Sequence, residues 1–329
     1  MERHRLGTTD HRVTEIGLGT WEIGGDWGDV SEETGRTAIR TALKGGVDFL
    51  DTADVYGDGR SERIIGETLS DHPAGEEVTV ATKVGRRLDP HTADGYTHEN
   101  LERFVERSRT NLGVESLDLV QLHCPPTSVY YRPETFAVLE SLREDGLIDA
   151  YGVSVERVEE GLKAIEYGGV ETVQVVFNPF RQRPAELFFR EAARRNVGVI
   201  VRVPLASGLL TGTMSADASF PENDHRNFNR EGDAFDVGET FAGVPLSVGV
   251  EAAERLRPAV PEDATLAQFA LRWILSFDAV TTVIPGSTSP EHIRDNVAAA
   301  DLPAPSGEDH ALVDAVYESV IRDHVHHRW

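Results

Sequence analysis

An alternation of short apolar runs with helix-length segments extends along most of this chain of 329 residues and restricts its fold more than any other feature. The runs expected to form strands occupy residues 16–19, 47–50, 78–82, 117–122, 148–153, 172–176, 197–203 and 280–284. The segments expected to form helices occupy residues 31–46, 61–70, 97–112, 133–144, 155–167, 184–195 and 266–276. Apolar strands separated by amphipathic helices indicate a parallel sheet that is buried on both faces. Eight such units favour an α/β fold of the closed (β/α)8 type, the TIM barrel.

The main alternative is a doubly wound dinucleotide-binding fold, which carries G-x-G-x-x-G after its first strand. Here Gly17 and Gly19 are followed by Glu22 at the place of the third glycine, so this signature is absent. The long irregular stretch at residues 212–245 is polar and too short for a domain, and it has the length of a lid or binding loop. We therefore expect one barrel domain over residues 1–329.

The two ends of the chain are expected to add elements to the barrel. The segment RHRLGTTDHRVTEIG contains two short β-like pieces around the turn-forming residues GTTD, which predicts an N-terminal β-hairpin. Residues 303–329 have the pattern of a spacer followed by a final helix, a C-terminal helical extension.

The charge of the chain excludes several kinds of partner. It has 56 acidic and 32 basic residues and a formal net charge of −24, so neither nucleic acid nor a membrane is expected to bind it. Every basic residue other than Lys44, Lys83 and Lys163 is arginine. An acidic surface that is poor in lysine favours a halophilic protein, because added salt screens its self-repulsion. A GC-rich genome would also favour arginine, for an unrelated reason.

The cellular location is predicted from what the sequence lacks. No apolar run reaches the ~18 residues of a membrane span, and the initial MERHRLG has no apolar signal core. The single cysteine, Cys124, has no partner for an internal disulfide. These features predict a cytoplasmic protein.

Four titratable residues follow successive strands and are expected to meet at one side of the barrel mouth. Asp51 and Tyr56 follow the second strand, Lys83 the third and His123 the fourth. Retention of Lys83 in a chain that otherwise favours arginine indicates that a compact ammonium is needed there. Tyr56 is a poor acid with an ordinary pKa near 10, and a neighbouring ammonium would lower that pKa. Asp51 would pair with Lys83, and His123 would orient a carbonyl oxygen beside the phenol.

These residues lie in motifs that resemble those of the aldo-keto reductase superfamily. The motifs are DFLDTADVYGDGRSERIIGETL, VATK, LDLVQLHCPP, YGVSVERVEEGL, VRVPLASGLLTG and IPGSTSPEHIRDNV, in the family's order. The resemblance implies a barrel that binds a nicotinamide cofactor without a Rossmann domain and transfers hydride to an aldehyde or ketone, possibly a sugar. By matching position it implies Tyr56 as the proton donor, supported by Asp51, Lys83 and His123.

The same resemblance assigns the cofactor-binding residues. Ser154 and Gln174 match the residues that hold the nicotinamide carboxamide, and Arg202 stands where many members stack an aromatic ring. Residues 204–208 would run under the pyrophosphate. The complete expected set is Gly19, Thr20, Trp21, Asp51, Ser154, Gln174, Arg202, Val203, Pro204, Leu205, Gly208, Gly286, Ser287, Thr288, His292 and Asn296.

The choice of cofactor is the point at which this sequence departs from the family pattern. Members that select NADPH commonly place lysine or arginine on the 2′-phosphate, whereas Gly286, Thr288 and His292 stand at the corresponding positions here. Ser287, Thr288 and Arg294 could still bind the phosphate. NADPH is the expected cofactor by family habit, and NADH is the alternative because neutral donors are weaker phosphate ligands.

Two other functions compete with a reductase of small carbonyl substrates. A barrel glycosidase would use Asp51 and a second acid such as Glu22, but it leaves Lys83 and Tyr56 unexplained. A cofactor-binding regulatory subunit with little turnover would keep all of these residues. No metal site is expected, because the histidines of DHVHHRW are too closely spaced to converge on one ion. The sequence leaves the oligomeric state and the physiological substrate open.

Overall fold

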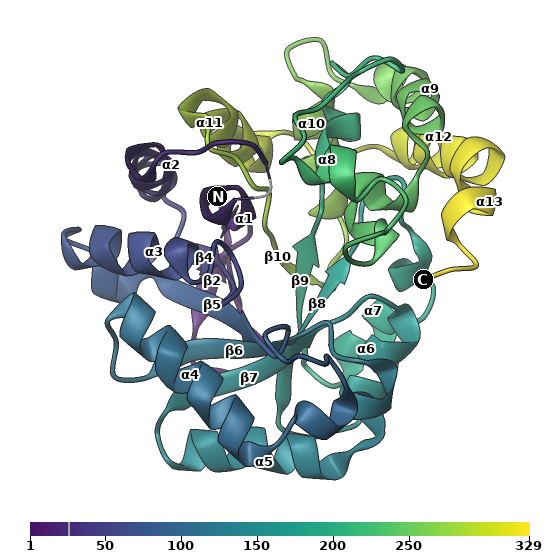
Figure 1. Ribbon diagram of the computed structural model, residues 1–329. Coiled ribbons are helices and arrows are strands. Elements are labelled where there is room, and N and C mark those ends of the chain that lie inside the picture. Colours follow the sequence, from purple (N-terminus) through teal and green to yellow (C-terminus); the bar gives the residue numbers. More distant parts are fainter. Residues whose placement is uncertain (26) are drawn as a thin grey trace.

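The computed structural model describes residues 1–25 and 27–329, and within them parallel strands form a barrel that helices surround (Figure 1). The barrel strands are β3 (Leu18–Gly19), β4 (Phe49–Asp51), β5 (Thr79–Val84), β6 (Leu117–His123), β7 (Ile148–Ser154), β8 (Val170–Val176), β9 (Gly198–Arg202) and β10 (Val280–Val283). Each pairs in parallel with its neighbour in sequence. The predicted (β/α)8 fold is therefore confirmed.

The barrel closes between its first and last strands. Ile16 forms a parallel bridge with Val283, and Gly19 forms one with Gly286. The N–H of Gly17 donates to the carbonyl of Val283 at 2.8 Å. A Cβ on Gly17 would lie 2.9 Å from the ring of Phe49, so glycine is required for this close approach. The first strand was predicted at residues 16–19, and β3 covers only the last two of these. The bridge at Ile16 shows that the strand-like pairing begins at residue 16, as predicted.

Helices follow the strands and pack outside the barrel. They are α1 (Trp21–Gly24), α2 (Glu32–Lys44), α3 (Arg60–Ser70), α4 (His98–Leu112), α5 (Pro133–Glu144), α6 (Val158–Ala164), α7 (Phe188–Arg194), α8 (His225–Phe228), α9 (Leu246–Leu256), α10 (Leu266–Ile274), α11 (Pro290–Ala298), α12 (Gly307–Val316) and α13 (Arg322–Val325). The first long helix begins as predicted, because the side chain of Ser31 accepts the N–H of Thr34.

Two helices begin later than the sequence pattern predicted. The helix expected from residue 155 starts at Val158, because the Glu160 carboxylate accepts the N–H groups of Glu156 and Arg157 and so caps the helix there. The helix expected from residue 184 starts at Phe188, because a separate 3-10 turn forms at Arg183–Ala185 around its proline.

The segment between β9 and α10 carries the largest addition to the barrel. It includes the predicted irregular stretch at residues 212–245, which contains α8 and two 3-10 turns, Val237–Glu239 and Phe241–Gly243. In Figure 1 this stretch lies over one side of the barrel, and its turn at Phe241–Gly243 contacts α13. We refer to residues 212–245 as the lid.

The predicted N-terminal hairpin is present and closes the end of the barrel at which the strands begin. Strands β1 (Arg3–Arg5) and β2 (Arg12–Thr14) pair in antiparallel fashion. The fully buried Leu6 and Val13 of the hairpin join a cluster of inward-facing strand residues, Phe49, Ala81, Leu119, Ala150, Ile200 and Ile284. Since apolar burial is the main stabilising term in folding, this cluster anchors the hairpin.

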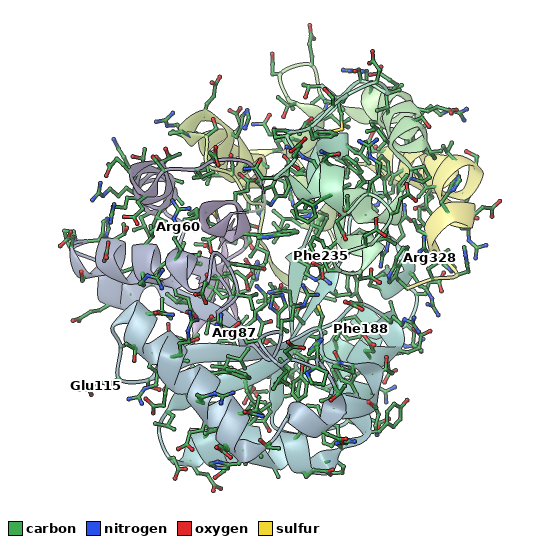
Figure 2. The ribbon with its side chains drawn as sticks, viewed as in Figure 1. Arg60, Arg87, Glu115, Phe188, Phe235 and Arg328 are labelled. Atoms are coloured by element: carbon green, nitrogen blue, oxygen red, sulfur yellow. The ribbon has the colours of Figure 1, made fainter. Side chains whose placement is uncertain are left out.

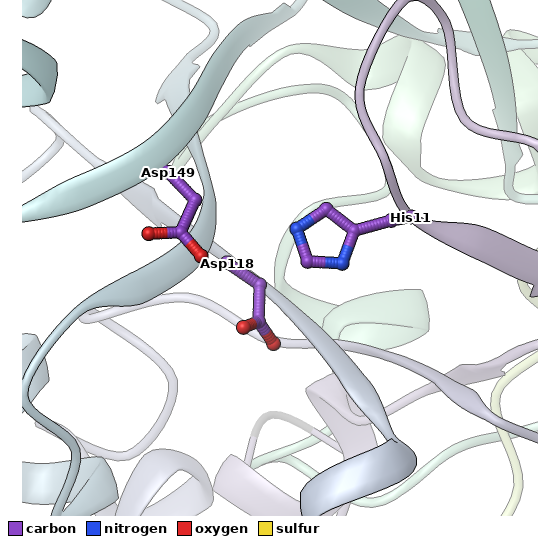
Figure 3. A group of neighbouring side chains, drawn as sticks. All are labelled: His11, Asp118 and Asp149. Atoms are coloured by element: carbon purple, nitrogen blue, oxygen red, sulfur yellow. The ribbon is translucent and has the colours of Figure 1, made fainter.

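A polar group at the same end connects the hairpin to two strands. Figure 3 shows the ring of His11 facing the carboxylates of Asp118 on β6 and Asp149 on β7, and their ligand-type atoms lie within 4.8 Å of one another. Asp118 accepts the N–H of Val80 at 2.7 Å, and Asp149 accepts the hydroxyl of Ser116 at 2.5 Å. Burial raises the pKa of Asp118, against the opposing effects of the Val80 N–H and of His11.

The predicted C-terminal extension consists of α12, a π-helical turn at Tyr317–Ile321 and α13. It packs against α9 and reaches the lid at Phe241–Gly243. Within residues 1–25 and 27–329, no helix is both long and apolar enough to cross a membrane.

Candidate active site

A cavity of about 630 Å³ opens at the carboxyl ends of the barrel strands. The whole cofactor set expected from the sequence lines it, namely Gly19, Thr20, Trp21, Asp51, Ser154, Gln174, Arg202, Val203, Pro204, Leu205, Gly208, Gly286, Ser287, Thr288, His292 and Asn296. Tyr56 and His123 also line it. Lys83 does not, because it is only 1% exposed and lies behind the cavity wall.

Lys83 connects the acid and the phenol that were expected to act together. Its ammonium donates to Asp51 Oδ1 at 2.5 Å, to the carbonyl of Thr52 at 2.8 Å and to the Tyr56 hydroxyl at 3.4 Å. The β4 and β5 strands pair directly, which places the end of one beside the end of the other. The ion pair and the hydrogen bond together fix the position of the phenol relative to the cavity.

Asp51 is engaged on both of its oxygens. While Oδ1 pairs with Lys83, Oδ2 accepts from Gln174 at 2.7 Å and from Gln121 at 3.3 Å. A carboxylate whose lone pairs are occupied in this way is poorly suited to act as a nucleophile or general acid. The geometry therefore does not support the glycosidase alternative, which needs Asp51 as one of two reacting carboxylates.

The electrostatics at Tyr56 differ from the sequence-based expectation. Burial raises the pKa of Tyr56, and the opposing effect of Lys83 is the smaller one. Burial also disfavours the charged form of Lys83, but Asp51 and Tyr56 outweigh it and raise the pKa of that ammonium. The lowering effect expected of Lys83 is therefore present, but burial outweighs it, and the pKa of Tyr56 lies above its ordinary value. The phenol is held protonated beside a charged ammonium.

His123 lies edge-on to Tyr56, with ring centroids 5.9 Å apart and the planes at 86°. Burial, together with Arg86, Lys83 and Arg202, lowers the pKa of His123 well below its ordinary value. Its ring is therefore neutral, and one nitrogen carries a proton that can be donated. Its buried Nδ1 has no hydrogen-bond partner among the described residues.

The backbone after β9 is strained where it lines the cavity. Val203, Ala206 and Ser207 have φ values of 52°, 48° and 52°, which residues with a Cβ rarely adopt. Asn178 donates to the carbonyl of Val203 at 2.9 Å, and the Ser207 hydroxyl donates to the carbonyl of Glu239 at 3.3 Å. Strained backbone that surrounding contacts hold in place is typical of ligand-binding sites.

A buried ion cluster beside the cavity was not predicted. Glu239 of the lid pairs with Arg86 at 2.6 Å and with Arg202 at 3.6 Å. Burial would raise the pKa of Glu239, but the two guanidinium groups lower it to about 2. Arg202 also donates to the carbonyl of Val155 at 2.9 Å. Arg86 follows Lys83 closely enough to have been suspected, whereas Glu239 lies in a stretch without periodicity and gave no signal.

An aromatic wall stands on the lid side of the cavity. The ring of Trp21 lies 6.2 Å from that of Tyr56 and nearly parallel to it, and it also contacts Trp27, His225 and Phe235. Figure 2 shows Phe235 near the centre of the view, above the middle of the barrel. Trp21 and Trp27 both line the cavity.

Glu22, on α1, also lines the cavity and lies close to the loop after β10. Its Oε1 is 3.5 Å from the position that a Cβ on Gly286 would take. Burial raises the pKa of Glu22 to about 7, against the opposing effects of Arg226 and of the Thr288 backbone. The sequence had singled out Glu22 only as a second acid for the glycosidase alternative.

Among the described residues, two groups of side chains have ligand-type atoms close enough for a metal ion. Besides the group around His11, Cys124, Glu156 and Glu239 lie within 4.8 Å of one another. Arg86 and Arg202 already neutralise that second group. Burial raises the pKa of the Cys124 thiol to about 11, so it is not a thiolate at neutral pH.

A closed barrel with a phenol, an ammonium, a carboxylate and an imidazole at the carboxyl ends of its strands is the architecture of a (β/α)8 enzyme. Comparison with known proteins specifies which one. A family model described as "Aldo/keto reductase family" matches residues 15–318. The NADH-specific methylglyoxal reductase of Escherichia coli (strain K12) is 31% identical over 324 residues, with 92% of this chain and 94% of that protein covered.

Solved structures show the same relationship. An aldo-keto reductase from Bacillus halodurans in its holo form is 25% identical, with a TM-score of 0.75 and 96% of each chain covered. A glycerol dehydrogenase from Gluconobacter oxydans is 27% identical, with a TM-score of 0.75, 98% of this chain and 96% of that chain covered. The chain belongs to the aldo/keto reductase family, and it is an NAD(P)H-dependent oxidoreductase of aldehydes or ketones.

Proposed function

We propose that this enzyme reduces a neutral aldehyde or ketone with Tyr56 as the proton donor. The proposal is based on the contacts of the Lys83 ammonium with both Asp51 and Tyr56 at the edge of the cavity. Reduction of a carbonyl creates an alkoxide, which must receive a proton. A protonated phenol with an ammonium at 3.4 Å can supply one, because the positive charge stabilises the phenolate that remains.

The residues around the cavity suit a nicotinamide dinucleotide. Ser154 and Gln174 offer hydroxyl and amide groups of the kind that hydrogen-bond a carboxamide. The strained backbone at residues 203–208 and the hydroxyls of Ser287 and Thr288 suit phosphate oxygens. The cofactor would supply the hydride. The neutral His123 would donate a hydrogen bond to the carbonyl oxygen, and Tyr56 would transfer the proton to it.

The cofactor is NADPH or NADH, and the adenosine end of the cavity discriminates weakly between them. Its described lining includes Ser287, Thr288, His292 and Asp295, and neither lysine nor arginine is among these. A 2′-phosphate would thus meet neutral donors and a carboxylate instead of a guanidinium fork. The relative from Escherichia coli is named as NADH-specific. We expect this chain to accept both cofactors.

The charges in the cavity favour a substrate without a carboxylate. The two arginines among the described lining residues are already engaged, Arg202 by Glu239 and Arg226 by both oxygens of Asp224. A substrate carboxylate would have to break one of these pairs to gain a partner. A neutral carbonyl compound can instead pack on Trp21 beside Tyr56.

The experiment compares two substrates that share one reacting ketone, pyruvate and its methyl ester, of which only pyruvate carries the negative charge. Methyl pyruvate should be reduced with a higher kcat/KM than pyruvate, with either cofactor, in buffer containing concentrated salt. Faster reduction of pyruvate would contradict the proposed substrate class. Cofactor binding with negligible turnover of every carbonyl compound would instead support the regulatory-subunit alternative.

Three further assignments belong to this proposal. The described residues 1–25 and 27–329 are treated as one barrel domain, because the hairpin and the C-terminal extension both pack on the barrel. The protein is proposed to be cytoplasmic, since Cys124 is its single cysteine. A net charge of −24 supports adaptation to concentrated salt.

A further inference from the structure

Trp329, the last residue of the sequence, is buried against the lid. It is 3% exposed, and its indole N–H donates to Asp236 Oδ1 at 2.9 Å. Arg181 stacks on the ring with its guanidinium carbon 4.2 Å from the ring centroid, and Arg183 donates to the main-chain oxygen of Trp329 at 2.6 Å. A large aromatic side chain with a satisfied polar group and a stacked cation has one defined position.

Two glycines of the lid make room for this ring. A Cβ on Gly243 would lie 2.5 Å from the Trp329 ring, and a Cβ on Gly238 would lie 2.8 Å from it. Asp236, the acceptor of the indole N–H, also accepts the N–H of Gly238 at 2.7 Å. The indole therefore contacts the lid on both sides of Glu239.

Glu239 is one of the lid residues that line the cavity. Its carboxylate pairs with Arg86 after β5 and with Arg202 at the end of β9, and its carbonyl accepts from Ser207. Arg202 in turn lines the cavity at the position expected for the nicotinamide. A continuous set of contacts thus leads from Trp329 through Asp236 and Gly238 to Glu239 and the cavity wall.

We propose that Trp329 is a positioning residue that holds Glu239 and the lid in place over the substrate end of the cavity. This inference rests on the proposed function for its kinetic readout. Trp329 itself does not line the cavity. Its loss would leave Tyr56, Lys83 and Asp51 in place and would loosen the lid segment that shapes the pocket above them.

The test compares Trp329→Ala with Trp329→Phe and with a control, His327→Ala, at an exposed neighbouring position. We expect Trp329→Ala to raise the KM for methylglyoxal about tenfold, equivalent to ~1.4 kcal/mol, with a smaller change in kcat. Trp329→Phe keeps an aromatic ring but cannot donate to Asp236, so it should give a smaller increase in KM. His327→Ala should leave both constants unchanged.

A second variant keeps the inference testable should Trp329→Ala fail to fold. Gly238→Ala introduces a methyl group that meets both Trp329 and Asp236, so it should reproduce the increase in KM. Hydrogen exchange provides a readout that does not depend on turnover: peptides covering residues 236–243 should exchange faster in Trp329→Ala, and those covering β5 and β6 should not. Unchanged KM and unchanged exchange at residues 236–243 in folded variants would overturn the inference.

If the wild-type protein binds cofactor but reduces no carbonyl compound, the proposed function fails while the exchange measurement still decides the role of Trp329.

Discussion

At the scale of single residues, the site depends on the charged side chain of Lys83, which is buried although burial of a charge costs free energy. Lys83 is almost completely buried and keeps its ammonium because Asp51 and the carbonyl of Thr52 compensate it. An arginine could not direct one compact donor at these oxygens and at the Tyr56 hydroxyl. This explains why a chain that otherwise favours arginine retains lysine at this position.

Replacement of Lys83 by methionine should therefore slow proton transfer without preventing the cofactor from binding. We expect kcat to fall at least ~100-fold, the usual contribution of a positioned proton donor, because the phenolate loses its stabilising cation. Lys163→Met, a substitution of a partly exposed lysine, is the matched control. A kcat near that of the wild type, in a variant that still binds cofactor, would mean that Lys83 has no such role.

Asp54 shows the cost of a buried carboxylate whose charge its neighbours compensate only in part. Both of its carboxylate oxygens are buried without a hydrogen-bond partner among the described residues. Burial and the neighbouring Glu62 raise its pKa from 3.8 to about 8. A carboxyl whose pKa is higher in the folded state costs no stability below its unfolded pKa, and it destabilises the fold increasingly as the pH rises from about 4 to about 8.

Asp54→Asn should remove this cost. The stability of the variant should match that of the wild type near pH 4 and should exceed it increasingly towards pH 8, by up to about 1.4 kcal/mol for each pH unit. Urea unfolding at several pH values measures the difference. An asparagine variant that is less stable than the wild type at pH 8 would show that the carboxylate is compensated in a way that the described contacts do not reveal.

At the scale of elements, the sequence predicted those strands and helix ends that depend on residues close together in the chain. Continuous apolar runs identified the strands, and the helix expected over residues 31–46 does begin at residue 31, its N-cap Ser31. The start of α6 was missed because it depends on the Glu160 side chain reaching back to the backbone at Glu156 and Arg157. Arg86 and Glu239 were missed for a related reason, since they pair across 153 positions of the sequence.

The site residues were predictable because barrel geometry gathers the strand ends. Once the eight strands were assigned, Asp51, Lys83 and His123 had to lie at one rim. What local patterns could not supply was the electrostatic balance at Tyr56, where burial outweighs the neighbouring ammonium. The extent of burial depends on Trp21 and on the lid, which no strand pattern specifies.

The hairpin below the barrel should act on stability alone. Leu6 is fully buried against strand residues at the end of the barrel away from the cavity. Leu6→Ala should cost roughly 2–5 kcal/mol of unfolding free energy, the usual range for a buried leucine, and should leave KM and kcat unchanged. Chemical unfolding of this variant beside Leu187→Ala, at a position that is 38% exposed, tests this separation of roles.

At the scale of the whole molecule, the net charge of −24 opposes the compact state. Ion pairs such as Arg36 with Glu32 and Glu67 offset this only locally, and they are partly exposed to solvent. Salt weakens both the pairs and the general repulsion. With such an excess of one sign the repulsion is the larger effect.

Stability should consequently rise with ionic strength. We expect Tm to increase between ~0.1 M and ~1 M KCl, as the Debye length falls from about 10 Å to about 3 Å. Sucrose at the same osmolality serves as the control for non-ionic stabilisation. A Tm that falls with KCl would indicate that surface ion pairs, and not net repulsion, dominate the electrostatics of the molecule.

In the proposed mechanism Tyr56 gives the proton to the carbonyl oxygen, and single-turnover kinetics of Tyr56→Phe isolate this step. Premixed variant and NADH or NADPH are combined with methylglyoxal, and the absorbance of the reduced nicotinamide is followed. The variant should bind cofactor as the wild type does but should oxidise it at least ~100-fold more slowly. Oxidation at the wild-type rate would mean that a group other than Tyr56 supplies the proton.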